Sequence, residues 1–283
     1  MIGIKKNMKG LHIKNLSLNK LFDVPVEEPG GANRLSSQAK LCIALTTVTV
    51  CLLLIHYLKF SSSFVELLRW VGGSSLRENE TYIFLKQSGY WELLTHAWWM
   101  FWHIIGYVLI PVLIIKLVFK EGVRQYGTGW GDTNQYAIWY VLLATPIVFF
   151  AFLASFREDF VTHYPFYSLA GRSWLDLIAW ELMYFIQFIC LEFFFRGFLL
   201  HSTKPSCGAG AIFIMMVPYT MIHFPKPWLE ATGAIFFGLF LAILAIRSRS
   251  IWGGALVHIT IAFSMDIFAL IQSGRIPTTL LPK

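Results

Sequence analysis

The feature that most limits the fold of this chain is a set of seven apolar stretches. Each is long enough, or nearly long enough, to span a lipid bilayer as a helix. They lie near residues 41–58, 93–118, 136–156, 174–200, 209–224, 228–246 and 251–272. A run of about 18 or more apolar residues is typical of a membrane-spanning helix. Because the hydrocarbon layer offers no water to backbone groups, such runs cross it as helices. We therefore expect an all-α, polytopic transmembrane helical bundle of about seven spans.

The composition supports a membrane protein. Of the 283 residues, 56% are hydrophobic and only 14% are charged, whereas soluble domains are about 25% charged. The stretch 62–71 is too short to span and mixes apolar with charged residues, so we expect a short helix at the membrane interface. We divide the chain into a basic, polar N-terminal tail (1–40), N-terminal transmembrane helices and loops (41–173), a core (174–272) and a C-terminal tail (273–283).

The net charge of +7 does not indicate nucleic-acid binding. Much of it lies in the first 40 residues, at Lys5, Lys6, Lys9, Lys14, Lys20, Arg34 and Lys40, and no DNA- or RNA-binding motif accompanies them. The positive-inside rule explains this pattern more simply, since cytoplasmic segments of membrane proteins are rich in lysine and arginine. We expect the N-terminus to be cytoplasmic, membrane lipids to be partners, and nucleic acid not to be one.

Two charges interrupt the fourth apolar stretch. In "LEFFFRGFLL", Glu192 and Arg196 are four residues apart, which puts them on one helical face, one turn apart. A charged side chain at the centre of a spanning helix costs about 2.5–3.5 kcal/mol on insertion scales. Each charge can offset the burial of the other. The pair is therefore either a structural ion pair or part of a functional site.

Histidines in later stretches favour the functional interpretation. His223 ends the fifth stretch in "VPYTMIHFPKP", and His258 lies inside the seventh in "GGALVHITIAFSMD". Imidazole is the acid or base available near neutral pH. A glutamate and a histidine together can take a proton from water and return it to a leaving amine, which is what amide hydrolysis needs. Asp266 lies two turns beyond His258 and is a possible auxiliary residue, while Glu181 is expected to be structural.

These motifs resemble a known family. The segments "EFFFRGFLL", "PYTMIHF" and "GLFLAILAIRSRSIWGGALVH" are similar, in order and spacing, to the motifs of the CPBP family. That family comprises the CAAX-prenyl proteases and the bacteriocin-processing or immunity-type membrane proteins, also called Abi proteins. The resemblance covers residues 174–270. It implies a hydrolase of the bacterial plasma membrane, an intramembrane endopeptidase that acts on peptide or protein substrates, some of them lipidated.

The family motifs can be compared with this sequence position by position. Glu192 and Arg196 match the second glutamate and the arginine of the first motif, while Leu191 stands at the first glutamate. Tyr219, in place of a phenylalanine, precedes His223 in the second motif. His258 matches the last motif, where Ala262 replaces an asparagine. In the characterised CAAX proteases the first glutamate acts with the histidines on the attacking water, and the asparagine helps to form the oxyanion hole.

Several alternatives follow from these departures. Either Glu192 acts alone on a slightly rotated helix, or the protein has lost catalysis and acts by binding, as an immunity protein or scaffold. If a metal were present, Glu192, His223 and His258 would form a His2Glu set typical of catalytic zinc; we expect no cofactor. A small transporter is disfavoured because no inverted repeat is visible. The leading prediction is a protease with Glu192, Arg196, His223 and His258 as catalytic residues, and Tyr219 and Asp266 as possible auxiliaries.

Overall fold

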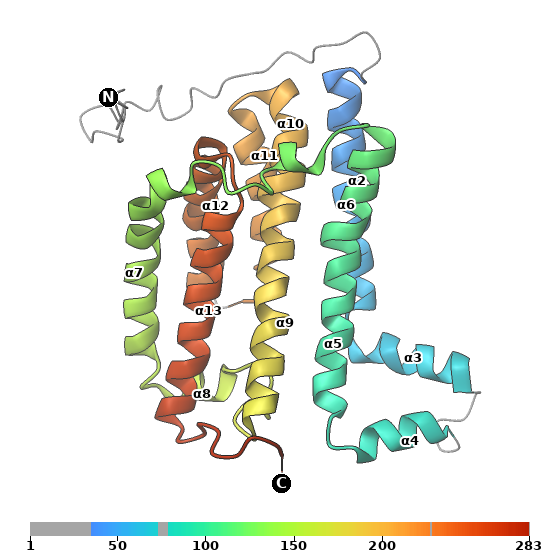
Figure 1. The fold of residues 1–283 in the computed structure, drawn as a ribbon, viewed down its shortest axis with the longest axis vertical. Coiled ribbons are helices and arrows are strands. Elements are labelled where there is room, and N and C mark those ends of the chain that lie inside the picture. Colours follow the sequence, from blue (N-terminus) through green and yellow to red (C-terminus); the bar gives the residue numbers. More distant parts are fainter. Residues whose placement is uncertain (1–34, 73–78, 227, 283) are drawn as a thin grey trace, which may run out of the picture.

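The computed structural model describes residues 35–72, 79–226 and 228–282, with the side chain of residue 229 left out. Most of the basic tail predicted for residues 1–40 therefore lies outside the described residues. Within the described ranges the chain is helical, with no strand, and its long helices run side by side (Figure 1). The predicted all-α transmembrane bundle is confirmed.

Six helical segments are long and apolar enough to cross a membrane, and a seventh is shorter. The six are Ser37–Leu58, Trp91–Val118, Thr133–Ala154, Trp174–Cys207, Glu230–Ser248 and Trp252–Gln272, and the shorter apolar helix is Gly210–Met221. They correspond one for one to the seven predicted stretches. Two boundaries differ. The fourth helix continues to Cys207 instead of stopping near 200, and the fifth ends at Met221 instead of 224, where the chain turns before Pro225.

The fourth helix is the centre of the bundle. It consists of α9 (Trp174–Glu192), a π-helical segment (Phe193–Leu199) and α10 (Leu200–Cys207). Half of its most apolar window is buried inside the protein, against 17% for the span that contains α7 (Ala137–Ala154). It therefore lies among other helices, whereas α7 faces mainly lipid. Ser173 caps its start by accepting a hydrogen bond from the Asp176 amide at 3.1 Å, which satisfies one of the free donors of the first turn.

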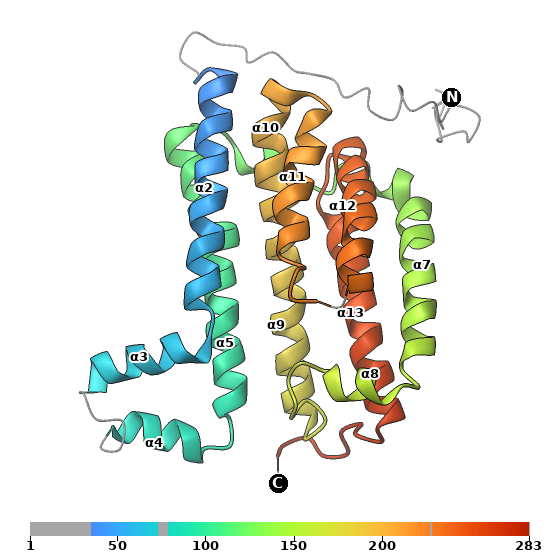
Figure 2. The same cartoon turned by 180° about the vertical axis from the view of Figure 1, so that it is seen from behind.

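The other spans surround this central helix. On one side stand α2 (Ser37–Leu58) and the helix that begins with α5 (Trp91–Ile104); on the other stand α13 (Trp252–Gln272) and then α7 (Figures 1 and 2). Behind it, α11 (Gly210–Met221) runs from the end of the bundle and joins α12 (Trp228–Ser248) through a turn that lies part-way along the bundle (Figure 2). Residues at this turn are therefore at membrane depth.

Two short helices project sideways from one end of the bundle. They are α3 (Ser61–Gly72) and α4 (Glu80–Gln87), which join α2 to α5 and lie across the direction of the spans (Figure 1). Since α2 ends and α5 begins there, α3 lies near one boundary of the apolar layer. The predicted helix at residues 62–71 is present; its place in the membrane interface remains a prediction.

The surface of α3 has three different faces. One packs against the protein, with Leu68 buried and the Phe64 ring stacked 5.3 Å from that of Trp98. A second exposes apolar side chains, with 84% of Trp70 accessible; Val71, at the end of the helix, is 70% accessible. The third exposes the ion pair of Arg69 with Glu66, 2.6 Å apart. A helix that divides its exposed surface between apolar and charged faces suits a boundary between lipid and water.

Candidate active site

The site lies where α9 and α13 face each other. The two helices run in opposite directions (Figure 1), and every fourth residue of one meets every fourth residue of the other, because residues four apart share a helical face. Going along α9, the facing pairs are Trp180 with Asp266, Tyr184 with Ala262, Phe188 with His258 and Glu192 with Gly254. This register brings Glu192 to His258, sixty-six residues later in the sequence.

Glu192 is the centre of the group. Its Oε1 is 3.0 Å from Arg196 Nη1 and 3.2 Å from His258 Nε2, and the side chains of Glu192 and Arg196 are completely buried. Among the described residues, none forms a hydrogen bond of good geometry to either Glu192 oxygen, so these are ion-pair contacts that leave lone pairs available. A carboxylate oxygen with a free lone pair can accept a proton from a water molecule.

Gly254 allows the helices to approach this closely. A Cβ at this position would lie 2.3 Å from Glu192 Oε2, far inside van der Waals contact. Small residues commonly let membrane helices pack at short distance. The glycine at 254 is therefore a condition for the contact between Glu192 and His258.

Helix α11 adds Tyr219 and His223. The Arg196 guanidinium lies over the Tyr219 ring, with its Cζ 4.0 Å from the centroid, a favourable cation–π geometry. The Tyr219 hydroxyl is 3.5 Å from His258 Nε2. His223 is next to this tyrosine: its Nδ1 is 2.8 Å from the Tyr219 carbonyl oxygen, and the two rings are 4.8 Å apart. If Nδ1 donates this bond, Nε2 of His223 is the nitrogen free to act on a substrate or water.

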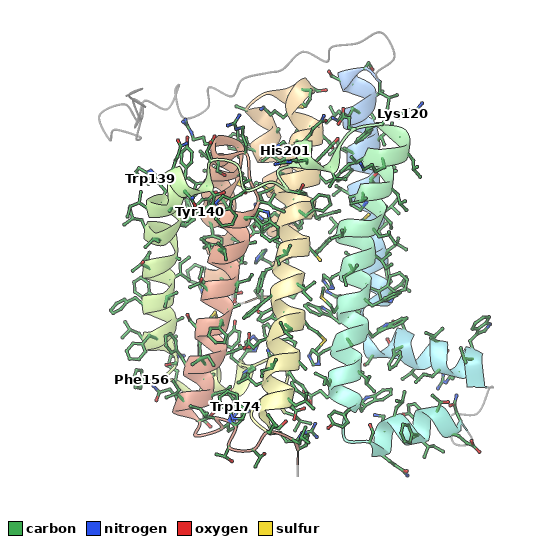
Figure 3. The ribbon with its side chains drawn as sticks, viewed as in Figure 1. Lys120, Trp139, Tyr140, Phe156, Trp174 and His201 are labelled. Atoms are coloured by element: carbon green, nitrogen blue, oxygen red, sulfur yellow. The ribbon has the colours of Figure 1, made fainter. Side chains whose placement is uncertain are left out.

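The π-helical segment begins immediately after Glu192. All seven of its residues, Phe193–Leu199, are buried, and π turns inside α-helices are frequent at functional sites. His201 follows one turn later, and its Nδ1 contacts the carbonyl oxygens of Arg196 at 2.8 Å and Gly197 at 3.0 Å. It thereby satisfies carbonyl groups of the wide turn. His201 lies toward the same end of the bundle as Lys120 and Tyr140 (Figure 3).

The positions at which the sequence departs from the family pattern lie outside the group. Leu191 is buried in the hydrophobic core on the side of α2 and α5, among aromatic residues of the π segment. Ala262 is buried one turn below His258, against Tyr184 and Trp180. Glu192, and not position 191, therefore faces His258. No polar side chain at 262 is available to help bind an oxyanion.

Asp266, predicted as a possible auxiliary, has a different partner. Its Oδ2 accepts a hydrogen bond from Trp180 Nε1 at 2.7 Å, and its side chain is completely buried. It lies two turns beyond His258 on α13, about 12 Å along the axis, and it does not join the Glu192 contacts. Glu181, the neighbour of Trp180, is also buried. These carboxyl groups are separate from the candidate site.

The arrangement does not provide a metal centre. Among the described residues, no group of three histidine, cysteine, aspartate or glutamate side chains is placed to hold a metal ion. Glu192 and His258 are in contact, but His223 is linked to them only through Tyr219. As placed in the structure, the three side chains do not form the His2Glu set of the zinc alternative.

Sequence reasoning missed two residues of the site, Gly254 and His201. Gly254 could be found only as one of several glycines in the last spans, since its role depends on the register between helices. His201 gave a weak signal as a histidine five residues after Arg196. Its contact depends on the π turn, which no local sequence pattern predicted.

Comparison with known proteins covers the segment that carries the site. Residues 172–264, about a third of the 283-residue chain, match the family model described as type II CAAX prenyl endopeptidase Rce1-like. The match includes Glu192, Arg196, Tyr219, His223 and His258. Comparisons with the curated proteins and with the solved structures gave no match. The segment that carries the candidate site, residues 172–264, is therefore similar to the CAAX-protease family.

Proposed function

We propose that this protein is an intramembrane endopeptidase that hydrolyses peptide bonds of membrane-associated substrates, lipidated ones included. The observation that carries the proposal is the buried contact of Glu192 Oε1 with both Arg196 and His258. Charged groups inside a membrane bundle are costly and are generally functional. A structural ion pair would need only Glu192 and Arg196. The additional histidine on another helix supplies a second group for proton transfer.

Each residue has a role in the proposed reaction. Glu192 removes a proton from water as the oxygen attacks the carbonyl carbon of the peptide bond, and it later gives that proton to the leaving amine. His258 binds the oxyanion that develops on the carbonyl oxygen, and His223 helps to position the water. Arg196 holds Glu192, and the Tyr219 ring holds the Arg196 guanidinium at 4.0 Å. One carboxylate thus acts as base and then as acid.

A second candidate function is supported by specific observations. Leucine stands at the position of the family's first glutamate and alanine at that of its asparagine, and Glu192 has no exposed surface. Such a site can be catalytically silent. In that case the protein acts by binding a partner, and the buried charges keep the helices in register.

Replacing one buried carboxylate at a time distinguishes the protease from the silent binding protein. Glu192→Gln keeps the shape and removes the base, so cleavage should fall by about 10²–10⁴-fold, the usual contribution of a positioned general base. Glu181→Gln replaces another buried carboxyl group on the same helix and should leave the rate unchanged. The assay is cleavage of a membrane-anchored or lipidated peptide in detergent, with and without a chelator.

Each outcome has a clear meaning. Equal cleavage by wild type and Glu192→Gln contradicts the protease mechanism. No cleavage by either, with partner binding retained, supports the silent protein. Loss of cleavage with the chelator and recovery with zinc would replace the glutamate mechanism by a metal-dependent one.

The orientation in the membrane is part of the proposal. The end of the bundle where α2 begins faces the cytoplasm. Lysine and arginine are most frequent there: six precede α2 in residues 1–34 and seven lie at that end within the described residues, whereas six described residues, together with Arg77 and Lys283 by their sequence position, fall at the opposite end. The seven are Lys40, Lys116, Lys120, Arg124, Lys204, Arg247 and Arg249. This bias follows the positive-inside rule.

A further inference from the structure

A loop from the N-terminal half of the chain touches both helices of the candidate site. It joins the second span to α7, and we call its residues 121–132 the brace. It crosses the end of the bundle at which His201 and Lys120 lie (Figure 3). The segment that matches the family begins only at residue 172, so the brace is a contribution of the unmatched half.

The brace is anchored to α2. Glu121 Oε2 is 2.8 Å from Lys40 Nζ, and both side chains are nearly buried. The Tyr126 hydroxyl donates a hydrogen bond to the same oxygen at 2.6 Å. Burial and, next, this hydrogen bond raise the pKa of Tyr126 well above its ordinary value, so the hydroxyl keeps its proton and remains a donor. The anchor therefore fixes Tyr126 relative to the first span.

At its centre the brace packs on the π-helical segment. A Cβ on Gly197 would lie 2.9 Å from the Tyr126 carbonyl oxygen, and a Cβ on Gly127 would lie 3.7 Å from His201 Cε1. Gly127 has a φ of 75°, which glycine adopts without strain. The loop thus touches the helix one residue after Arg196 and about 7 Å along the axis from Glu192.

The next residues bind the start of α13. The Gly127 carbonyl accepts a hydrogen bond from the Ile251 amide at 2.9 Å. The Thr128 carbonyl accepts one from Trp252 Nε1, also at 2.9 Å. Trp252 is the first residue of α13 and lies six residues, about 9 Å, before His258. One short loop therefore contacts the glutamate helix and the histidine helix close to the reacting groups.

We infer that the brace positions the active site: by holding the π segment at Gly197 and the start of α13 at Trp252, it sets the spacing at which Glu192 meets His258. This inference rests on the proposed function, because it gives the brace a role in the same reaction. Catalytic groups must be held within about 0.5 Å of their productive geometry. Tyr126, Thr128 and Trp252 are thus positioning residues, since none of them touches Glu192 or His258 in the structure.

Two tryptophans allow a matched test in the full-length protein. Trp252→Phe removes the hydrogen bond between the brace and α13. Trp130→Phe removes a comparable indole hydrogen bond to Asn134 at 3.0 Å, which stays within the loop region. We expect Trp252→Phe to lower kcat for peptide cleavage about tenfold or more at unchanged KM, as small misplacements do, and Trp130→Phe to change neither. Tyr126→Phe, which removes the hydroxyl bonded to Glu121, should act in the same direction as Trp252→Phe.

A second measurement does not depend on cleavage. In protein labelled with ¹⁵N-histidine, the imidazole signal that is missing from His258→Gln identifies His258. This signal should shift in Trp252→Phe and Tyr126→Phe and stay in place in Trp130→Phe. An unchanged signal in both brace variants overturns the inference, as does an equal effect of all three variants. If the wild type does not cleave but the expected shifts are present, the proposed function is refuted, while the inference that the brace positions Glu192 and His258 still stands.

Discussion

Gly254→Ala tests the contact between α9 and α13 most directly. The new Cβ would lie 2.3 Å from Glu192 Oε2 and 2.8 Å from its carboxyl carbon, whereas ordinary contact needs about 3.5 Å. The carboxylate would have to move by about 1 Å within a site where it has no exposed surface. Overpacking of this kind costs about 1–3 kcal/mol of unfolding free energy, and a 1 Å misplacement of a reacting group costs about 10²-fold in rate.

Two other glycines serve as controls. Gly253→Ala also creates a clash, 2.2 Å from the Tyr140 ring, on a face of α13 turned about 100° from that of Gly254. It should destabilise the protein to a similar degree without a specific loss of rate. Gly233→Ala meets no atom within 4 Å and should be neutral or stabilising by about 0.5–1 kcal/mol.

The measurements are thermal unfolding in detergent and the rate of peptide cleavage per folded molecule. We expect Gly254→Ala to lose about 100-fold in rate, and the two controls to stay close to wild type. A Gly254→Ala protein that cleaves as well as Gly253→Ala would show that the close approach of Gly254 to Glu192 has no part in catalysis.

Three further predictions concern the ion pair and the membrane topology. Arg196→Ala should reduce the unfolding free energy by about 3–5 kcal/mol, because it leaves a buried carboxylate without its partner; normal abundance and thermal stability would contradict this. Cysteine labelling should reach His163 and Lys204 positions from opposite sides of the membrane, and labelling of both from one side would refute the topology. Spin labels on α3 should be accessible to oxygen in the lipid at Val71 and to a water-soluble relaxant at Arg69, and equal accessibility would disprove the interfacial placement.

The helices and their number could be predicted because they depend on local properties of the chain. A run of apolar residues long enough to span a bilayer is visible in the sequence, whatever its neighbours are. The end of the fourth span was misplaced because the helix continues to Cys207 through the mostly polar residues 201–207, beyond the apolar run. The short fifth helix was found for the same reason as the others, and its end is set by the turn before Pro225.

The candidate site could be predicted in part. Glu192 and Arg196 pair because they are four residues apart on one helix, a relation that the sequence states directly. The placement of His258 beside them could be expected only from the resemblance to a family. Asp266 has Trp180 as its hydrogen-bond partner, a contact that the sequence did not indicate, and its auxiliary role stays a prediction.

The sequence by itself therefore determined the spans, the short helix α3 and the local pair of charges, because each follows from residues close together along the chain. Tertiary structure alone decided which carboxyl group meets His258, which glycine makes room for it, and which loop holds the two helices in place. These depend on the register of two antiparallel helices, and one residue of slip would turn Glu192 away by about 100°. That register is set by packing between segments far apart in the sequence.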